Sequence, residues 1–535
     1  MVEITANTLY DNNKRELQEY FWGIVPTSIG DALRTSYTKT LPQTNEYLID
    51  GLEKVLWRYH LKLGILTEKV EENLSKLREG VIITGQQPAP CGGKGFIGNK
   101  ISTICKLAKL SEENSKTLVP VFYVADYDGI QSEITHTHFP NPSSSKSVAI
   151  SITAEELVGR AANTLQLPGP RWLKIVIEEL SNLYTEFFAD TSPPVRKLLN
   201  TRLECLLALL STTYLSSSTL TGWFVKIWGT IANIHNDFGV IFLPMSNPEV
   251  RDIVIQGGGY EQLVKKRKTF IEQFNRASEK LRQYGIKTAV GDRPKDYVPF
   301  FLECDHDAYR VNLSFEQGMI SGTCPICGMR YEIPFDENNP NFDNIRRQIS
   351  PRVDSSHILV QFLLPIKIRV SGPGEISYFA QVFPAASAIG IKMPVLLKYT
   401  RMFYNAPWLE TLGKKISEKN LPSLHSRDFF KALSGWVKAK RRNEPELLLQ
   451  ATERLTNLIN SVYNSLQTIP DKDVERYLSW QFGVFGTGTF GQEVSWNWID
   501  LAVNTGIEDY LQTYMRYYEN ETPISGYYFL NTLTT

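Results

Sequence analysis

The stretch 81-VIITGQQPAPCGGKGFIGNK-100 decides the fold of this chain. It begins with the apolar run 81–83, which predicts a buried strand, and continues with glycines at 85, 92, 93, 95 and 98. Glycine loses more backbone freedom on folding than any other residue, so this cluster indicates that something approaches the main chain closely. A helical pattern at 100–110 and a β-branched run at 117–125 follow. Strand, glycine loop, helix and strand predict the start of a parallel α/β sheet.

The same arrangement recurs later, where 365–390 has the pattern of a strand, a glycine turn and a helix, followed by a strand at 393–399. We therefore predict an α/β protein with a Rossmann-like parallel-sheet core, helical insertions, a zinc-binding β-hairpin insert and a helical C-terminal part. Residues 447–469 have nearly coiled-coil spacing. The expected units are an N-terminal helical segment 1–80, core halves 81–150 and 346–400, a helical insertion 151–235, a connecting region 236–345 with a hairpin at 300–334, and a helical domain 401–535.

Composition bounds the class of protein. A chain of 535 residues is too long for one ordinary core. Lys and Arg together number 57, as do Asp and Glu, so a protein that coats nucleic acid or an anionic membrane is not expected. The N-terminus lacks a signal pattern, no apolar run is long enough to span a bilayer, and six cysteines are too few for a disulfide framework. We expect a cytoplasmic protein that acts on small molecules.

The glycine loop is a candidate anion site. In open α/β sheets, ligands bind beyond the carboxyl ends of the strands, where loop amides and a helix N-terminus carry partial positive charge. Gly92 and Gly93 would let the backbone fold around a phosphate, with Lys100 as a nearby cation. The spacing is not that of a Walker loop. The alternative is a tight structural turn.

Carboxylates follow two of the predicted strands. Asp126 and Asp128 lie two residues apart, so in an extended chain they would point the same way and could hold an ammonium group, Mg2+ or a proton. The alternative is that they form a turn. Gly372 and Gly374 shape a second turn before Glu375, which could cap a helix or bind a ribose hydroxyl or an amine.

A metal site is predicted by the segment Cys324-Pro-Ile-Cys327-Gly, because a two-residue spacer followed by glycine lets two thiolates face one ion. Cys304 and His306, about twenty residues upstream, would complete a tetrahedral zinc site. Four protein ligands leave no open position, so a structural role is expected.

Together these segments resemble the bacillithiol-biosynthesis cysteine-adding enzymes, a family of cysteine ligases. The resemblance rests on TGQQ at 84–87 with Lys100 beyond it, and on motifs at 119–128, 349–351, 363–365 and 371–381. It implies a Rossmann-like core with inserts, a coiled-coil segment used in dimerisation, and a nucleotide site. The cleft residues that it implies are Thr84, Gly85, Gln86, Gln87, Lys100, Asp126, Asp128, Gly372, Gly374 and Glu375. The chain departs from the family where Tyr127 replaces a histidine.

We therefore predict an ATP-dependent ligase that joins an amino acid, cysteine in the first instance, to the amine of an amino-sugar conjugate. Lys100 would stabilise charge on phosphate oxygens, and Asp126 or Asp128 would accept the amine's proton. Zn2+ would be structural, and Mg2+ is a further candidate. The alternatives are a ligase or nucleotidyl-transfer enzyme for another amine, and a zinc-bearing adaptor that binds RNA or protein without catalysis.

Overall fold

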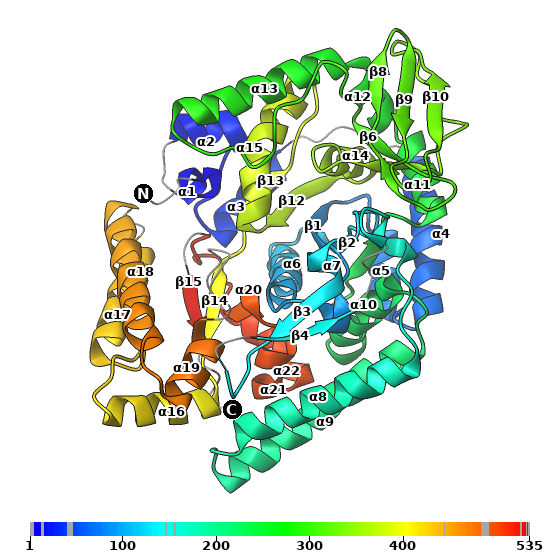
Figure 1. Cartoon of the computed structure of the whole chain (residues 1–535). Helices are drawn as coiled ribbons and strands as arrows, with labels where there is room; N and C mark the ends of the chain where they lie inside the picture. Colours follow the sequence, from blue (N-terminus) through cyan, green and yellow to red (C-terminus); the bar gives the residue numbers. More distant parts are fainter. Residues whose placement is uncertain are drawn as a thin grey trace.

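Five parallel strands form the central sheet of the computed structural model, in the order β13-β12-β1-β2-β5 (Figure 1). The structure describes residues 5–11, 15–39, 46–144, 147–152, 157–442, 445–482, 492–524, 527–530 and 532. The strands are β1 (Val81–Gln86), β2 (Val119–Val124), β5 (Ile241–Pro244), β12 (Ile366–Ser371) and β13 (Val395–Lys398). The predicted α/β class with a Rossmann-like core is confirmed.

The order of the strands places a crevice at the carboxyl end of β1. From β1 the chain moves to β2 and β5 on one side, and it returns much later to β12 and β13 on the other side. Ligands of open α/β sheets bind at such a reversal of strand order. β5 lies within the range that we assigned to a connecting region, yet it is an edge strand of the core sheet.

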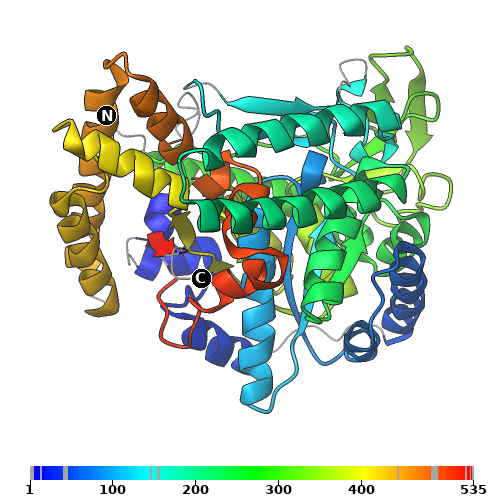
Figure 2. The same ribbon diagram turned by 90° about the horizontal axis from the view of Figure 1, so that it is seen from below.

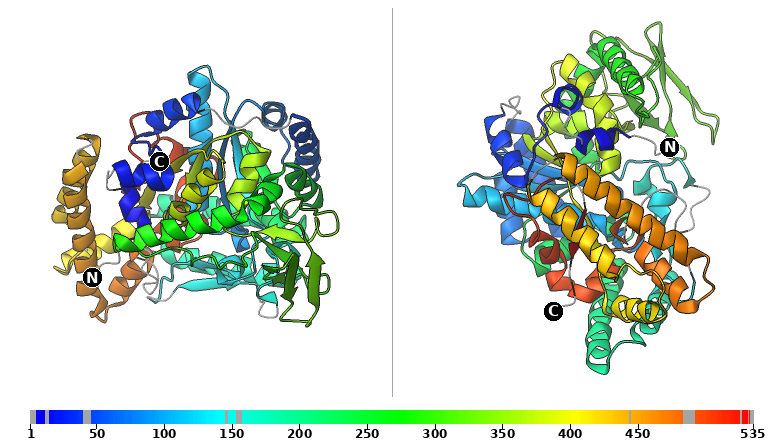
Figure 3. Two further views of the ribbon diagram at one scale, coloured as in Figure 1. Left: turned by 90° about the horizontal axis from the view of Figure 1, so that it is seen from above. Right: turned by 90° about the vertical axis from the view of Figure 1, so that its left-hand side faces the viewer.

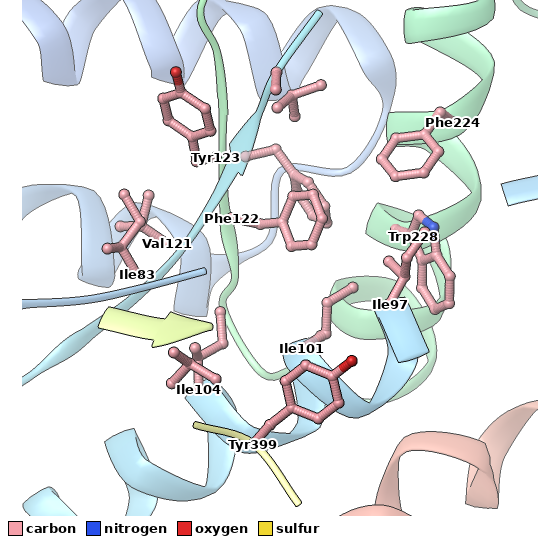
Figure 4. Close-up of a cluster of buried hydrophobic side chains, with 14 of the residues drawn as sticks. Ile83, Ile97, Ile101, Ile104, Val121, Phe122, Tyr123, Phe224, Trp228 and Tyr399 are labelled. Carbon is pink, nitrogen blue, oxygen red and sulfur yellow. The ribbon is translucent and has the colours of Figure 1, made fainter. Parts of the chain in front are cut away.

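Helix α6 (Phe96–Glu113) connects β1 to β2 and packs on the sheet. Its buried residues Ile97, Ile101 and Ile104 belong to a cluster of apolar side chains that includes Phe122 of β2 and Phe224 and Trp228 of α10 (Leu220–Gly229), as Figure 4 shows. The apolar strands buried on both faces are those expected of a parallel sheet covered by helices.

Helices cover the sheet and form the insertion between its halves. The pair α8 and α9 lies side by side across one face of the molecule (Figure 2). The helices before the connecting region are α1 (Ala6–Asp11), α2 (Arg15–Trp22), α3 (Ile29–Thr38), α4 (Glu46–Leu63), α5 (Glu68–Ser75), α7 (Ser132–Thr135), α8 (Pro170–Phe188), α9 (Pro193–Leu215) and α10 (Leu220–Gly229). The described part of the chain contains no helix with both the length and the apolar character needed to cross a membrane.

The connecting region carries the predicted β-hairpins, which project at the upper right of Figure 1. Its strands are β6 (Phe300–Glu303), β7 (Arg310–Val311), β8 (Ser314–Glu316), β9 (Met319–Thr323), β10 (Arg330–Pro334) and β11 (Ile349–Pro351). Its helices, followed by those of the second core half, are α11 (Pro248–Gln256), α12 (Gly259–Lys265), α13 (Arg267–Gln283), α14 (Ser356–Leu363) and α15 (Pro373–Ala388).

The C-terminal part is not one separate unit. Helices α17 (Arg427–Arg442) and α18 (Pro445–Gln467) lie side by side at the edge of the molecule (Figure 3), and Leu455, Ile459, Val462 and Leu466 of α18 are buried within the chain. After them the chain returns to the core, where α22 packs on α6. The other elements of the C-terminal part are α16 (Pro407–Glu418), α19 (Lys472–Phe482), α20 (Gln492–Ser495), α21 (Ile499–Thr505), α22 (Ile507–Met515) and the paired strands β14 (Arg401–Tyr404) and β15 (Tyr527–Leu530). Strands β3 (His136–Phe139) and β4 (Val148–Ser151) form a separate antiparallel pair.

Candidate active site

A pocket of about 680 Å³ lies at the carboxyl ends of β12, β1 and β2. It brings together two segments that are far apart in the sequence, because its wall includes both the end of β1 and the glycine turn at the start of α15. The predicted residues that line it are Gly85, Gln86, Gln87, Lys100, Asp128, Gly372, Gly374 and Glu375.

Lys100 and Glu375 form the floor of this pocket. Lys100 Nζ lies 2.6 Å from Glu375 Oε2, and it also donates to the carbonyl oxygen of Gly85 at 2.8 Å. The Lys100 side chain is only 2% exposed. Glu375 Oε2 accepts a further bond from the Gly372 amide at 2.7 Å, so it caps α15 and holds the lysine at once. The two predicted roles of Glu375, helix cap and pocket carboxylate, coexist in one side chain.

Arg369 places a second buried cation in the pocket. It is fully buried in β12, and in the described part of the chain its Nε and Nη2 atoms have no hydrogen-bond partner. Burial lowers the pKa of this guanidinium, because the low-dielectric surroundings disfavour its charge. A buried polar group without a partner is costly, so this arrangement indicates that an anion completes it.

His357 of α14 and Tyr378 of α15 form another part of the pocket wall. His357 Nε2 and Tyr378 Oη are 2.6 Å apart, and His357 Nδ1 has no partner among the described residues. Burial, and next the charge of Arg369, hold the pKa of His357 well below its usual range. The ring is therefore neutral at pH 7 and offers a hydrogen-bonding atom to a ligand.

Asp128 lies at the rim of the pocket between an amide and a cation. Its Oδ2 accepts from Gln87 Nε2 at 2.9 Å, and its Oδ1 is 3.6 Å from Arg310 Nη1. Burial raises the pKa of Asp128, while Arg310 and the bond from Gln87 oppose that rise. A carboxylate with a raised pKa is a better proton acceptor than an exposed aspartate.

Asp126 corrects our expectation, because it faces away from this pocket. The chain turns at 125–128 instead of staying extended, and Asp128 N donates to Ala125 O at 3.3 Å. Asp126 lines a separate cavity of about 540 Å³, where its Oδ1 accepts from the Ser246 amide at 2.8 Å. Burial raises its pKa to about 6. The two carboxylates therefore cannot act on one substrate group.

Comparison with known proteins assigns the chain to a family. The family model described as Bacillithiol biosynthesis BshC, N-terminal Rossmann-like domain, matches residues 6–400. This chain belongs to the BshC family. Proteins named "Putative cysteine ligase BshC" from Bacillus cereus (strain G9842) and Desulforamulus reducens are 24% and 26% identical to it over 74% and 77% of this chain, and each alignment covers 68% of the relative. A third protein of that name, from Bacillus cereus (strain ZK / E33L), is 24% identical over 86% of this chain and 80% of its own length.

In this BshC-family chain the glycine loop itself is not an anion cradle, which corrects our expectation for Gly92 and Gly93. Neither residue lines the pocket; the Gly93 amide donates to Pro90 O at 3.0 Å, and Gly92 O accepts from Trp228 Nε1 at 2.9 Å. A Cβ atom on Gly92 would lie 2.7 Å from Trp498 Nε1. The glycines admit the chain's own C-terminal segment, so the alternative of a tight structural turn is the correct one.

Thr84 is likewise a structural residue. It is fully buried, and its hydroxyl donates to Val370 O at 2.9 Å, which ties β1 to β12 beneath the pocket. Gly85 has its own steric reason, since a Cβ there would lie 2.6 Å from Tyr123 O of the neighbouring strand.

Sequence reasoning missed Arg369, which lines the pocket, and Arg310, which pairs with Asp128 at its rim. Arg369 is a charged residue inside the apolar strand IKIRVS, directly before the SGPGE turn. That position was a usable signal, because a fully buried charge needs a partner or a ligand. Arg310 comes from a different unit of the chain, and its approach to Asp128 depends on tertiary packing alone.

The cysteine hairpins gather four metal-ligand atoms, but not the four that we predicted. The ligand atoms of Cys304, Asp307, Cys324 and Cys327 all lie within 4.8 Å of one another. His306 is exposed and is not a member of this group, so Asp307 replaces it.

Proposed function

We propose that the pocket is the active site of an ATP-dependent ligase that joins cysteine to the amine of a small amino-sugar conjugate, as in bacillithiol-type thiol biosynthesis. The observation that carries the proposal is the buried Arg369 guanidinium, which lines the pocket with Lys100 and the start of α15 and whose Nε and Nη2 atoms have no hydrogen-bond partner among the described residues. Membership of the BshC family and the name of the relatives support the reaction class and the amino acid.

The cationic side of the pocket suits an activated carboxylate. An amide cannot form from an unactivated carboxylate and an amine at neutral pH, and ATP supplies the activation when it is bound. Arg369, Lys100 and the N-terminal amides of α15 would hold phosphate or carboxylate oxygens, because two cations and a helix N-terminus favour negative charge. Asp128 and Glu133 are the pocket carboxylates available to Mg2+.

The opposite rim suits the amine. Asp128 would orient the attacking amine and accept its proton as the new carbon–nitrogen bond forms. Neutral His357 would accept or donate a hydrogen bond without adding charge. Asp126 has no part in this step, because it lines the other cavity.

The test is incubation of the purified protein with ATP, Mg2+, cysteine and an amino-sugar conjugate, followed by mass spectrometry. We expect an adduct with the mass of both substrates less one water, together with ADP or AMP. Asp128→Asn should lower kcat/KM by roughly 100-fold or more, while the matched variant Asp126→Asn should keep kcat. If neither adduct nor ADP or AMP forms, the cysteine reaction is wrong.

The alternatives give different outcomes in the same assay. A ligase or nucleotidyl-transfer enzyme for another amine would convert ATP only when a mixture of other amines is supplied. A zinc-bearing adaptor would show no turnover, and its activity in cells would survive Lys100→Ala but not loss of Cys324 and Cys327.

Two further properties stay proposals. The first is dimer formation through α17 and α18, which the resemblance implies. Phe430, Leu447 and Leu449 are exposed on this helix pair and could form the contact. Light scattering tests the dimer. A reducing, cytoplasmic setting suits the six unpaired cysteines.

A further inference from the structure

We propose that Cys304, Asp307, Cys324 and Cys327 bind one zinc ion, and that this ion fixes Arg310 beside the active-site pocket. The site uses an aspartate as its fourth ligand. Its support comes from the geometry of two turns and is independent of the proposed ligase reaction.

The two turns that carry the ligands have the same backbone structure. In the first, Ala308 N donates to Cys304 O at 2.8 Å and Cys304 N donates to Tyr309 O at 2.9 Å. In the second, Gly328 N donates to Cys324 O at 3.0 Å and Cys324 N donates to Met329 O at 2.9 Å.

Both turns also have a left-handed residue at the equivalent position. The φ angle is 55° at Ala308 and 74° at Gly328. A left-handed alanine is unusual, so the first turn holds a conformation that its sequence does not favour. By this correspondence Asp307 occupies the place of Cys327, three residues after the first cysteine.

The distances suit a tetrahedral ion. Cys304 Sγ and Cys327 Sγ are 3.5 Å apart, and Cys324 Sγ is 3.3 Å from Asp307 Oδ2. Zinc–ligand bonds of about 2.3 Å to sulfur and about 2.1 Å to oxygen place tetrahedral ligand atoms roughly 3.5 to 3.8 Å apart. Three thiolates select zinc over Mg2+ or Ca2+, which prefer oxygen ligands. Asp307 Oδ1 accepts from the Tyr309 amide at 2.9 Å, which orients the carboxylate.

The first turn leads directly to Arg310, which contacts a residue of the active-site pocket. Arg310 follows Tyr309, its amide donates to Gly159 O at 3.1 Å, and its side chain donates to Pro351 O at 2.7 Å. Its guanidinium reaches Asp128 at 3.6 Å. Arg310, which pairs with the candidate base, therefore lies three residues after the ligand Asp307, and loss of the ion would release that pairing.

The first experiment measures the zinc content of protein purified under reducing conditions, by elemental mass spectrometry. We expect one zinc per chain in the wild type and in the matched control His306→Ala. Asp307→Ala should weaken zinc binding at least 10-fold in chelator competition, and Cys324→Ser should abolish it. A zinc-free wild type that fails to take up added zinc, a Cys304–Cys327 disulfide, or a loss of zinc in His306→Ala but not in Asp307→Ala would each overturn the site.

A second measurement uses only the wild-type protein, so its result does not depend on whether a variant folds. Cobalt substituted into the wild type should give the intense visible absorption of a tetrahedral thiolate site, and weak octahedral absorption would contradict the site. Hydrogen exchange of the peptides around 157–162 and 308–312 should speed up at least 10-fold when zinc is removed. Unchanged exchange in these peptides would overturn the coupling to Arg310 and leave the metal site standing.

Discussion

Lys100 Nζ contacts Glu375 Oε2 at 2.6 Å although 275 residues separate the two in the sequence. This ion pair joins the helix that follows β1 to the helix that follows β12, on the two sides of the reversal in strand order. Both halves of the core therefore meet in one charged contact at the base of the pocket. The expectation that the bends near residues 90 and 373 converge on one pocket is wrong for the first bend, because the pocket is lined by the end of β1 and the start of α15 while Gly92 packs against Trp498.

The first prediction separates stability from function in this pair. Glu375→Gln should lower the thermal midpoint, because it leaves Lys100 as a buried charge without its counter-ion. Adding Lys100→Met should recover much of the midpoint, since the unpaired charge is then gone. kcat/KM should nevertheless fall roughly 100-fold in every variant without Lys100. Activity that recovers in the double variant would show that the lysine acts only through packing.

The second prediction concerns the unpartnered charge of Arg369. Arg369→Met should raise the thermal midpoint of the ligand-free protein, because a fully buried cation costs stability when two of its nitrogen atoms have no hydrogen-bond partner in the described part of the chain. The same variant should lose the rise in midpoint that ATP or substrate gives the wild type, which thermal unfolding with and without ligand measures. A drop in the ligand-free midpoint together with normal ligand stabilisation would show that Arg369 is structural.

The third prediction contrasts two glycines from the two turns. Gly92→Ala should lower the thermal midpoint, since Gly92 has φ of 79° and its Cβ would lie 2.7 Å from Trp498. A Cβ atom on Gly374 would meet no other atom within 4 Å. Gly374→Ala should therefore leave the thermal midpoint unchanged and weaken ligand binding at the start of α15 instead. Calorimetry and ligand titration on both variants check this. Equal effects of both substitutions would contradict our assignment of the first turn to stability and the second turn to ligand binding.

The sequence predicts features that depend on neighbouring residues better than features that depend on contacts between distant parts of the chain. Strand patterns and glycine turns are local, so the α/β core and the meeting of residues 85–87 with 372–375 were predictable. The reason for the glycines in the first turn was not, because Trp498 approaches from the far end of the chain and no local pattern marks that contact.

The candidate site shows the same limit at the level of side chains. The two-residue spacing of Asp126 and Asp128 predicts that they share one face of an extended strand. In the structure a turn at 125–128 separates them. The sequence pattern predicts His306 as the fourth ligand, whereas the backbone of the turn places Asp307, three residues after Cys304, in that position.

The last prediction is a pH effect carried by Asp500, which anchors the C-terminal segment. Asp500 Oδ1 accepts from Tyr184 Oη at 3.0 Å and Oδ2 from Tyr404 Oη at 2.9 Å. Burial raises the pKa of this carboxyl to about 7, above its ordinary value near 3.8. Between these two values the folded protein binds a proton that the unfolded chain has released, so stability should fall as the pH rises from about 4 to 7 and then level off.

Asp500→Asn removes this titration, and the thermal midpoints of the wild type and the variant should therefore converge or cross as the pH rises. Each pKa unit corresponds to about 1.4 kcal/mol, so the free energy of unfolding of the wild type should fall by on the order of 2 kcal/mol relative to that of the variant between pH 5 and pH 7. Thermal unfolding across pH 5–8 measures the difference, and the exposed Glu508→Gln of the next helix serves as the control that should run parallel to the wild type. Parallel curves for Asp500→Asn as well would mean that the carboxyl is already ionised in the folded protein, and the two tyrosine hydroxyls would then be stabilising a buried anion.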